Sequence, residues 1–180
     1  MDRPTSNERP LTEPSLPDPV PTLLERSEPM DIVVGVLTFN DGATAPAAAK
    51  GLIEGFRRYA PEKRVLVVNC DAGSQDGTPD LIEQAAGHDA PFWAVRHAVS
   101  GASLHVLSES GVPGRDAAIR LLAEVAERLT AKACLVVDGN LKSAHPRWSE
   151  LLAAPILDKG ADCVLPHFSR NRYEETLTNT

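Results

Sequence analysis

The sequence predicts an α/β fold with a mainly parallel sheet and helices on both of its faces. Three observations from residue 31 onward lead to this prediction. Short runs rich in β-branched residues alternate with stretches of helical periodicity. Several of these runs are apolar throughout, which indicates strands covered on both faces. The alternation repeats about every thirty residues, which is the length of a βαβ unit.

Residues 1–29 differ in composition from the rest of the chain. Seven prolines lie among Ser, Thr, Asp and Glu, and the isolated leucines follow neither a helical nor a strand period. Such a segment cannot bury enough apolar surface to offset its chain entropy. We therefore expect a disordered, proline-rich tail over residues 1–29 and a single domain over residues 30–180. A docking peptide within residues 20–24 is the less favoured alternative.

Five short apolar runs are the predicted strands. They lie at residues 32–37, 65–69, 104–107, 133–137 and 163–165. Parallel sheets bind their ligands at the carboxyl ends of the strands, where the loops leave. The loops after these runs are therefore the expected positions of functional residues.

Helices fill the intervals between the predicted strands. The first covers residues 47–59 and presents Leu52, Ile53 and Phe56 on one face. The second follows Pro79, a residue whose fixed φ suits the first turn of a helix.

Two further helices are predicted in the second half of the chain. The third covers residues 116–129, with a buried stripe at Ile119, Leu122, Ala126 and Leu129. The fourth begins at Pro146, and Pro155 should kink or end it, because proline has no N–H to donate within a helix.

Charge and cysteine content limit the classes of partner and the compartment. The net charge of −7 argues against a nucleic-acid partner, which needs clustered Lys and Arg, but not against a nucleotide. Cys70, Cys134 and Cys163 lie in or beside apolar runs, which favours buried, reduced thiols. Neither an apolar stretch of membrane-spanning length nor a secretory signal is present. We therefore expect a cytoplasmic protein.

The loops after the first two predicted strands are polar. The first reads Thr38-Phe39-Asn40-Asp41-Gly42, which either faces a ligand or simply turns the chain. After the second strand, Asp71 is placed to accept hydrogen bonds from a base or a ribose. Asp76, Thr78 and Pro79 are better explained as the start of the next helix.

A possible anion site precedes the third predicted helix. Gly114-Arg115 puts a glycine and a cation at a helix N-terminus, where free N–H groups and the helix dipole favour negative charge. A solvated first-turn arginine is an equally good interpretation. The Gly-x-Gly-x-x-Gly fingerprint and the P-loop are both absent, which removes most support for NAD enzymes and P-loop NTPases.

A possible metal site follows the run at residues 133–137. Asp138-Gly139-Asn140 offers two oxygen ligands, and Mg²⁺ or Mn²⁺ takes such oxygens and shares them with a diphosphate. An ordinary Asp-Gly turn remains the alternative. Lys142 follows this motif, and Arg170 and Tyr173 lie in a basic, aromatic segment near the end of the chain.

Together these loops resemble glycosyltransferase family 2 and its GT-A relatives, over residues 31–180. The most specific match is the Asp71-Ala72-Gly73-Ser74-Gln75-Asp76-Gly77-Thr78 block, and residues 32–40 look like the family's opening strand and turn. The resemblance implies a Rossmann-like GT-A domain in which Thr38, Asn40, Asp71, Gly114 and Arg115 bind the nucleotide. Asp138 and Asn140 would hold Mg²⁺ or Mn²⁺, although the second carboxylate of the family's Asp-x-Asp motif is an amide here.

Within this group the chain looks closest to mannosylglycerate synthase-like and glucosyl-3-phosphoglycerate synthase-like enzymes. The resemblance implies transfer of a hexose from a GDP- or UDP-sugar to a small anionic acceptor. Lys142, Arg170 and Tyr173 would lie toward the diphosphate, the sugar and the acceptor. The family's C-terminal half has no counterpart in these 180 residues, and the resemblance identifies no nucleophile or base in this chain.

Three other functions are compatible with the sequence. The first is a non-catalytic nucleotide-sugar binder, which the amide at Asn140 favours. The second is a nucleotidyltransferase, although residues 38–42 lack the Gly-rich basic loop that such an enzyme needs. The third is an interaction module that uses the proline-rich tail.

Overall fold

The computed structural model describes residues 16–97, 112, 114–142 and 144–166. Within them the chain forms a four-stranded sheet in the order β3-β2-β1-β4, and every neighbouring pair is parallel. The strands are β1 (Ile32–Thr38), β2 (Val65–Asp71), β3 (Phe92–Arg96) and β4 (Ala133–Asp138). The predicted mainly parallel sheet is confirmed.

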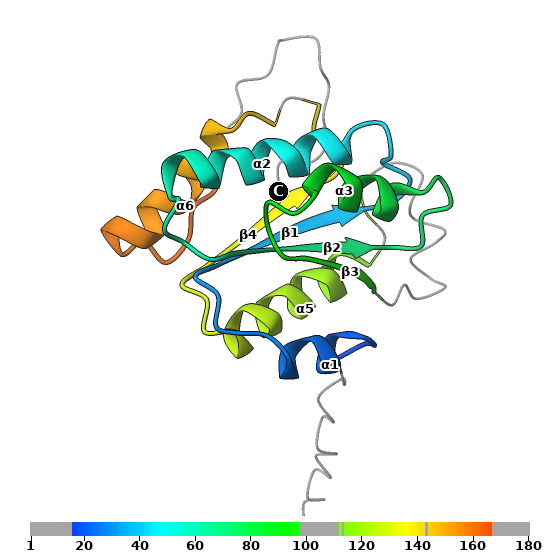
Figure 1. Cartoon of the computed structure of the whole chain (residues 1–180), viewed down its shortest axis with the longest axis horizontal. Coiled ribbons are helices and arrows are strands. Elements are labelled where there is room, and N and C mark those ends of the chain that lie inside the picture. Colours follow the sequence, from blue (N-terminus) through cyan, green and yellow to red (C-terminus); the bar gives the residue numbers. More distant parts are fainter. Residues whose placement is uncertain (1–15, 98–111, 113, 143, 167–180) are drawn as a thin grey trace, which may run out of the picture.

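Helices cover both faces of the sheet, as predicted (Figure 1). On one face lie α2 (Ala45–Tyr59), α3 (Thr78–Ala86) and α6 (Arg147–Lys159). On the other lie α5 (Arg115–Arg128) and the short α1 (Val20–Glu25). Each face therefore has its own apolar layer, and the sheet separates the two.

The central strand β1 is buried along its whole length. Val33 and Leu37 point into the layer beneath α5, whereas Ile32, Val34 and Val36 point into the layer beneath α2. This explains why the run is apolar at every position instead of alternating. Gly35 allows α5 to approach, since a Cβ at this position would lie 2.1 Å from Leu122 Cδ1.

Three predicted strands are confirmed, and each extends one or two residues past the predicted end. Residues 104–107 lie outside the described part of the chain, and residues 163–165 are not a strand. The prediction missed β3. Its five residues alternate between buried and exposed positions over too short a distance to distinguish a strand from a loop in the sequence.

The expected tail is partly folded. From residue 16 onward the chain is described, and residues 20–25 form α1. Val20 is completely buried, and Leu23 and Leu24 pack partly buried against the layer beneath α5. The prediction of disorder is therefore wrong for this stretch. The isolated leucines had no periodicity of their own because their apolar partners come from another part of the chain.

Two helix details also differ from the prediction. In α5, Ala118, Leu122 and Val125 form the centre of the buried face, and Ile119 lies on its flank with 38% of its surface exposed. In α6, the helix continues through Pro155. The carbonyl that loses its helical donor there belongs to Leu151, which is 53% exposed, so water can replace the missing N–H.

The three cysteines are free thiols. Burial raises the pKa of Cys70 to about 12 and that of the largely buried Cys134 to about 11, so both are protonated at neutral pH. Cys163 is exposed, because its segment does not join the sheet as predicted. Among the described helices, none has the length and apolar character that crossing a membrane would require.

Candidate functional site

Three predicted site residues end neighbouring strands at the carboxyl edge of the sheet. Thr38 of β1 is opposite Asp71 of β2, and Leu37 of β1 is opposite Asp138 of β4. The parallel topology therefore brings the ends of β1, β2 and β4 together, as the sequence predicted. We call this region, with the loops that follow these strands and the start of α5, the carboxyl edge.

A buried polar chain lies beneath this edge. The Asn69 Nδ2 group donates to Val36 O at 3.1 Å and to Thr38 Oγ1 at 2.8 Å. Thr38 Oγ1 donates in turn to Asp71 Oδ1 at 3.0 Å. All three side chains are at most 6% exposed. The Thr38 hydroxyl is thus committed to joining β1 to β2.

The Asp71 carboxylate organises the loop that follows β2. Besides the Thr38 hydroxyl, it accepts hydrogen bonds from the Ser74 hydroxyl at 2.5 Å and from the Gly73 and Ser74 N–H groups at 2.8 Å. A carboxylate has about four acceptor positions, and here the protein fills all four. In this arrangement Asp71 shapes the loop after β2.

Asn40 fastens the loop after β1 to the loop after β2. Its N–H donates to Ser74 Oγ at 2.8 Å, and its Oδ1 accepts from the Gln75 N–H at 2.9 Å. Asn40 has a φ of 57°, a left-handed conformation that asparagine tolerates. These contacts fit the interpretation of residues 38–42 as a turn. The exposed Asn40 holds the two loops together.

The carboxyl edge carries several carboxylates. Burial raises the pKa of Asp41 above its ordinary value, despite the hydrogen bond that it accepts from the Phe39 N–H. Three neighbouring negative charges add to this rise, those of Asp76, Asp138 and Asp71. The pKa of Asp76 is lowered, chiefly by the hydrogen bond from the Thr78 hydroxyl. Asp41 therefore lies close to several like charges at this edge.

The predicted anion-binding arginine and the predicted metal ligand contact each other. Arg115 Nη1 forms an ion pair with Asp138 Oδ1, across 23 positions of sequence. Arg115 is the first residue of α5 and follows Gly114, whose φ of 64° turns the chain into the helix. The two side chains are 45% and 32% exposed, so solvent reaches both of them.

The backbone at Asp138-Gly139-Asn140 is tightly held. The Gly139 N–H donates to Leu37 O at 2.7 Å. A Cβ at Gly139 would lie 2.7 Å from Thr38 Cγ2 and 3.0 Å from Ala45 Cβ. The middle position of the motif must therefore be glycine, because it packs against the end of β1 and the start of α2.

The residues of this motif fit part of a metal site. Among the described residues, no three His, Cys, Asp or Glu side chains converge to hold an ion. Asp138 is partly exposed, and Asn140 and Lys142 are exposed. One or two protein oxygens suffice for Mg²⁺ when water and phosphate supply the other ligands. The predicted residues Arg170 and Tyr173 lie outside the described residues.

A small cavity of about 260 Å³ lies beside the ends of β2 and β3. It is lined by Asp71, Ser74, Pro79, Ala94, Val95 and Arg96. The Arg96 side chain covers Gly73, and no carboxylate in the described part of the chain pairs with it. The prediction missed Arg96 because it missed β3. The aromatic and β-branched residues at 92–95 were the available signal.

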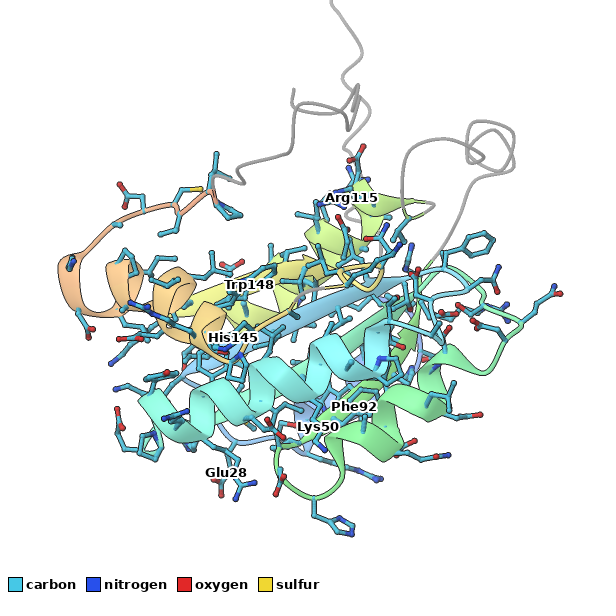
Figure 2. All side chains as sticks on the ribbon, turned by 90° about the horizontal axis from the view of Figure 1, so that it is seen from above. Glu28, Lys50, Phe92, Arg115, His145 and Trp148 are labelled. Atoms are coloured by element: carbon cyan, nitrogen blue, oxygen red, sulfur yellow. The ribbon has the colours of Figure 1, made fainter. Side chains whose placement is uncertain are left out.

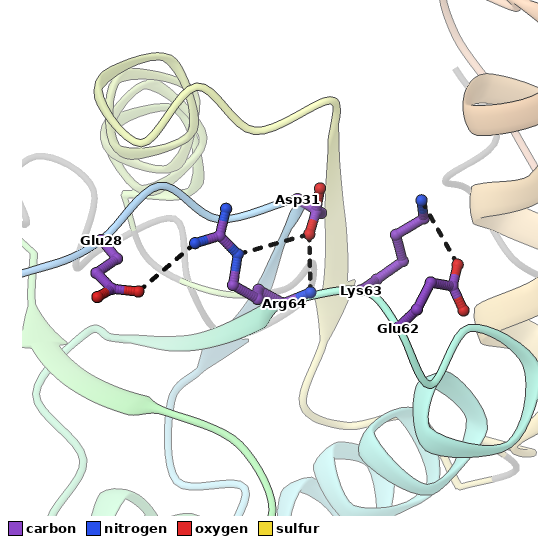
Figure 3. A network of polar contacts seen from close by, with 5 residues as sticks. All are labelled: Glu28, Asp31, Glu62, Lys63 and Arg64. Carbon is purple, nitrogen blue, oxygen red and sulfur yellow. Dashed lines mark hydrogen bonds and ion pairs between the residues drawn. The ribbon is translucent and has the colours of Figure 1, made fainter.

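A larger cavity of about 470 Å³ lies at the opposite, amino edge of the sheet. Its charged lining residues are mostly paired. Arg64 contacts Glu28 at 3.6 Å and Asp31 at 3.8 Å, and Lys63 contacts Glu62 at 3.5 Å (Figure 3). Figure 2 shows Glu28 on the opposite side of the molecule from Arg115. The larger cavity is therefore remote from every predicted site residue that the structure describes.

No protein family and no curated protein matches the chain. Solved structures show partial similarity to the chain, among them the following three. One is glucosyl-3-phosphoglycerate synthase of M. tuberculosis, at a TM-score of 0.46 and 17% identity, covering 72% of this chain and 41% of that one. The same enzyme with Mn²⁺, UDP-glucose and phosphoglyceric acid gives a TM-score of 0.44, 16% identity and coverages of 73% and 41%.

The third is mannosyl-3-phosphoglycerate synthase of Rubrobacter xylanophilus, at a TM-score of 0.42 and 16% identity, covering 72% of this chain and 36% of that one. This chain thus spans about two fifths of the length of the structures that it resembles. Glucosyl-3-phosphoglycerate synthase is also one of the enzymes that the sequence motifs resemble.

Proposed function

We propose that the chain is the nucleotide-sugar-binding part of a GT-A-type glycosyltransferase. The proposed reaction transfers a hexose from a UDP- or GDP-sugar to a small anionic acceptor, with Mg²⁺ or Mn²⁺. One observation carries the proposal: Arg115 and Asp138 meet at the carboxyl edge, where parallel sheets bind ligands. A cation and a carboxylate side by side, both open to solvent, suit a diphosphate and its metal ion.

Each of these residues has a proposed task. Asp138 and Asn140 hold the metal, which when bound offsets the negative charge on the leaving diphosphate. Arg115 binds the diphosphate through its guanidinium, together with the first N–H groups of α5. Lys142 adds a second positive charge from the exposed loop after Asn140. The sugar and the acceptor bind near Arg170 and Tyr173 in this proposal, as the resemblance to the family implies.

We place the nucleoside along the loops after β1 and β2. Thr38, Asn40 and Asp71 support those loops by the contacts described above. The nucleoside then lies against their outer surface and toward the 260 Å³ cavity beside Arg96. The free thiols of the chain suit the reducing cytoplasm, which is the location that we propose.

A second candidate function is binding of a nucleotide sugar without turnover. One observation favours it: the motif has an amide at Asn140 where a second carboxylate would bind the metal more strongly.

The decisive experiment is calorimetric titration of the 180-residue chain with UDP and with GDP, each with and without Mn²⁺. Binding of one nucleotide that depends on Mn²⁺ is the expected result, and it also identifies the base. Absence of binding for both nucleotides in the presence of Mn²⁺ would contradict the proposal. Incubation with UDP-glucose or GDP-mannose and phosphoglyceric acid, followed by mass spectrometry, then separates the two candidates: a glycosylated product indicates a transferase.

A further inference from the structure

The Arg115–Asp138 ion pair joins two residues that the proposed function assigns to different ligands. Arg115 is assigned to the diphosphate and Asp138 to the metal ion. In the ligand-free chain each is the partner of the other. Among the described residues neither side chain has a further hydrogen bond or ion pair. Both ligands therefore compete with the same internal contact.

The backbone holds both partners in place. Asp138 is the last residue of β4, and the Gly139 N–H fastens the following peptide to Leu37 O at 2.7 Å. Arg115 begins α5 directly after the turn at Gly114. Rotation of either side chain is enough to break the contact. Because both side chains are partly exposed, such a rotation needs no change in the core.

The charges around the pair make the competition unequal. A divalent cation that approaches Asp138 alone meets the guanidinium at Oδ1, and the two cations repel each other. A diphosphate that approaches together with the metal gives the guanidinium a new partner, to which it can donate two parallel hydrogen bonds. The released carboxylate is then free to bind the metal.

We propose that Arg115 keeps metal ions off Asp138 until a nucleoside diphosphate is present, so that the chain takes up the metal–nucleotide complex instead of the free metal. This inference rests on the proposed function. Metal and nucleotide then bind with positive coupling. Since such coupling is reciprocal, Mn²⁺ raises the affinity for the nucleotide by the same factor as the nucleotide raises the affinity for Mn²⁺.

The test measures Mn²⁺ affinity of the full chain by electron paramagnetic resonance, without nucleotide and with saturating UDP, and again with GDP. Three proteins are compared: wild type, Arg115→Gln and Arg120→Gln. Arg120 lies on the same helix, is exposed and pairs with no carboxylate in the described part of the chain, so it is the matched control for loss of charge.

The proposal predicts that Arg115→Gln raises the affinity for Mn²⁺ alone by about fivefold and removes most of the coupling to the nucleotide. Arg120→Gln should change neither quantity by more than about twofold. Adding Asp138→Asn to Arg115→Gln should abolish the gain in Mn²⁺ affinity, which shows that the gained metal binds at Asp138.

Three results would overturn the inference. The first is an unchanged or weaker Mn²⁺ affinity in Arg115→Gln, the second is equal gains in both single variants, and the third is independent binding of Mn²⁺ and nucleotide to the wild type. The measurements with UDP and GDP also test the proposed function separately. If neither UDP nor GDP binds the wild type in the presence of Mn²⁺, the proposed function fails. Nucleotide binding that depends on Mn²⁺, together with an Arg115→Gln variant whose affinity for Mn²⁺ alone is not raised, refutes only the role of Arg115.

Discussion

The two edges of the sheet differ in what their charged residues do. At the amino edge, the larger cavity is surrounded by cations that already have carboxylate partners, such as Arg57 with Asp89 at 2.7 Å and Arg64 with Glu28 and Asp31. At the carboxyl edge the cavity is smaller, yet polar side chains end the strands and Arg96 has no carboxylate partner among the described residues. Cavity size alone therefore points away from the edge at which we propose the site.

The direction of the strands explains this difference. At the carboxyl edge the chain leaves β1, β2 and β4 for loops whose polar groups and following helix N-termini can face a ligand. At the amino edge the chain enters the strands. There Asp31 accepts the Arg64 N–H at 2.9 Å and fastens the segment before β1 to the segment before β2. Charges at that edge hold chain segments together.

The largest expected effect is a loss of nucleotide affinity when the carboxyl edge is changed, compared with a change at the amino edge. Asp138→Ala should weaken Mn²⁺-dependent nucleotide binding by about 100-fold, or roughly 2.7 kcal/mol, because it removes the only carboxylate of the proposed metal site. Arg64→Ala at the amino edge should leave the affinity within about twofold of wild type. Calorimetry on both variants provides the comparison. An equal loss of affinity in both would place the ligand elsewhere.

A second change tests whether the carboxyl edge depends on close packing. Gly139→Ala should lower the free energy of unfolding by about 1–3 kcal/mol, since the added methyl group collides with Thr38 and Ala45. Asn140→Ala, at the exposed neighbouring position, should cost less than about 0.5 kcal/mol. Urea unfolding measures both values. Equal stability of the two variants would show that the backbone after β4 can move aside.

The smallest expected effect concerns two carboxyl groups whose pKa values are shifted in opposite directions. The pKa of Asp31 is lowered, mainly by the hydrogen bond from the Arg64 N–H, whereas burial raises the pKa of Asp41. Asp31 therefore adds stability above its unfolded-state pKa and loses that contribution as the pH falls through its lower folded-state pKa. Asp41 behaves oppositely, because its contribution is complete below the unfolded-state pKa and is lost as the pH rises through its higher folded-state value.

Replacing these two groups should reveal the difference. At pH 7, Asp31→Asn should destabilise the chain and Asp41→Asn should stabilise it slightly. Both differences should shrink when unfolding is measured in acid, below the pKa of both carboxyl groups. Carboxyl titrations followed by NMR give the two pKa values directly. A pKa of Asp41 below that of Asp31 would contradict the burial and the neighbouring negative charges described for Asp41.

Local sequence patterns were sufficient to predict three of the four strands of the described sheet. The runs at 32–37, 65–69 and 133–137 are apolar throughout because each is covered on both faces, and that property is visible without any structure. The strand-end positions of Thr38, Asp71 and Asp138 followed from the same runs. The strand β3 was not recognised because its five residues give only a short alternation. The helix α1 was not recognised because its apolar residues have partners only in the folded chain.

Periodicity and composition thus predicted a parallel α/β fold and the edge at which its polar loops gather, because strand burial and chain direction leave local patterns. The partners of the polar residues became visible only with the fold. The contacts that join Thr38 to Asp71 and Arg115 to Asp138 span 33 and 23 positions. No pattern of nearby residues encodes which acceptor a side chain reaches at such separations, since strand order and helix packing alone bring the two groups together.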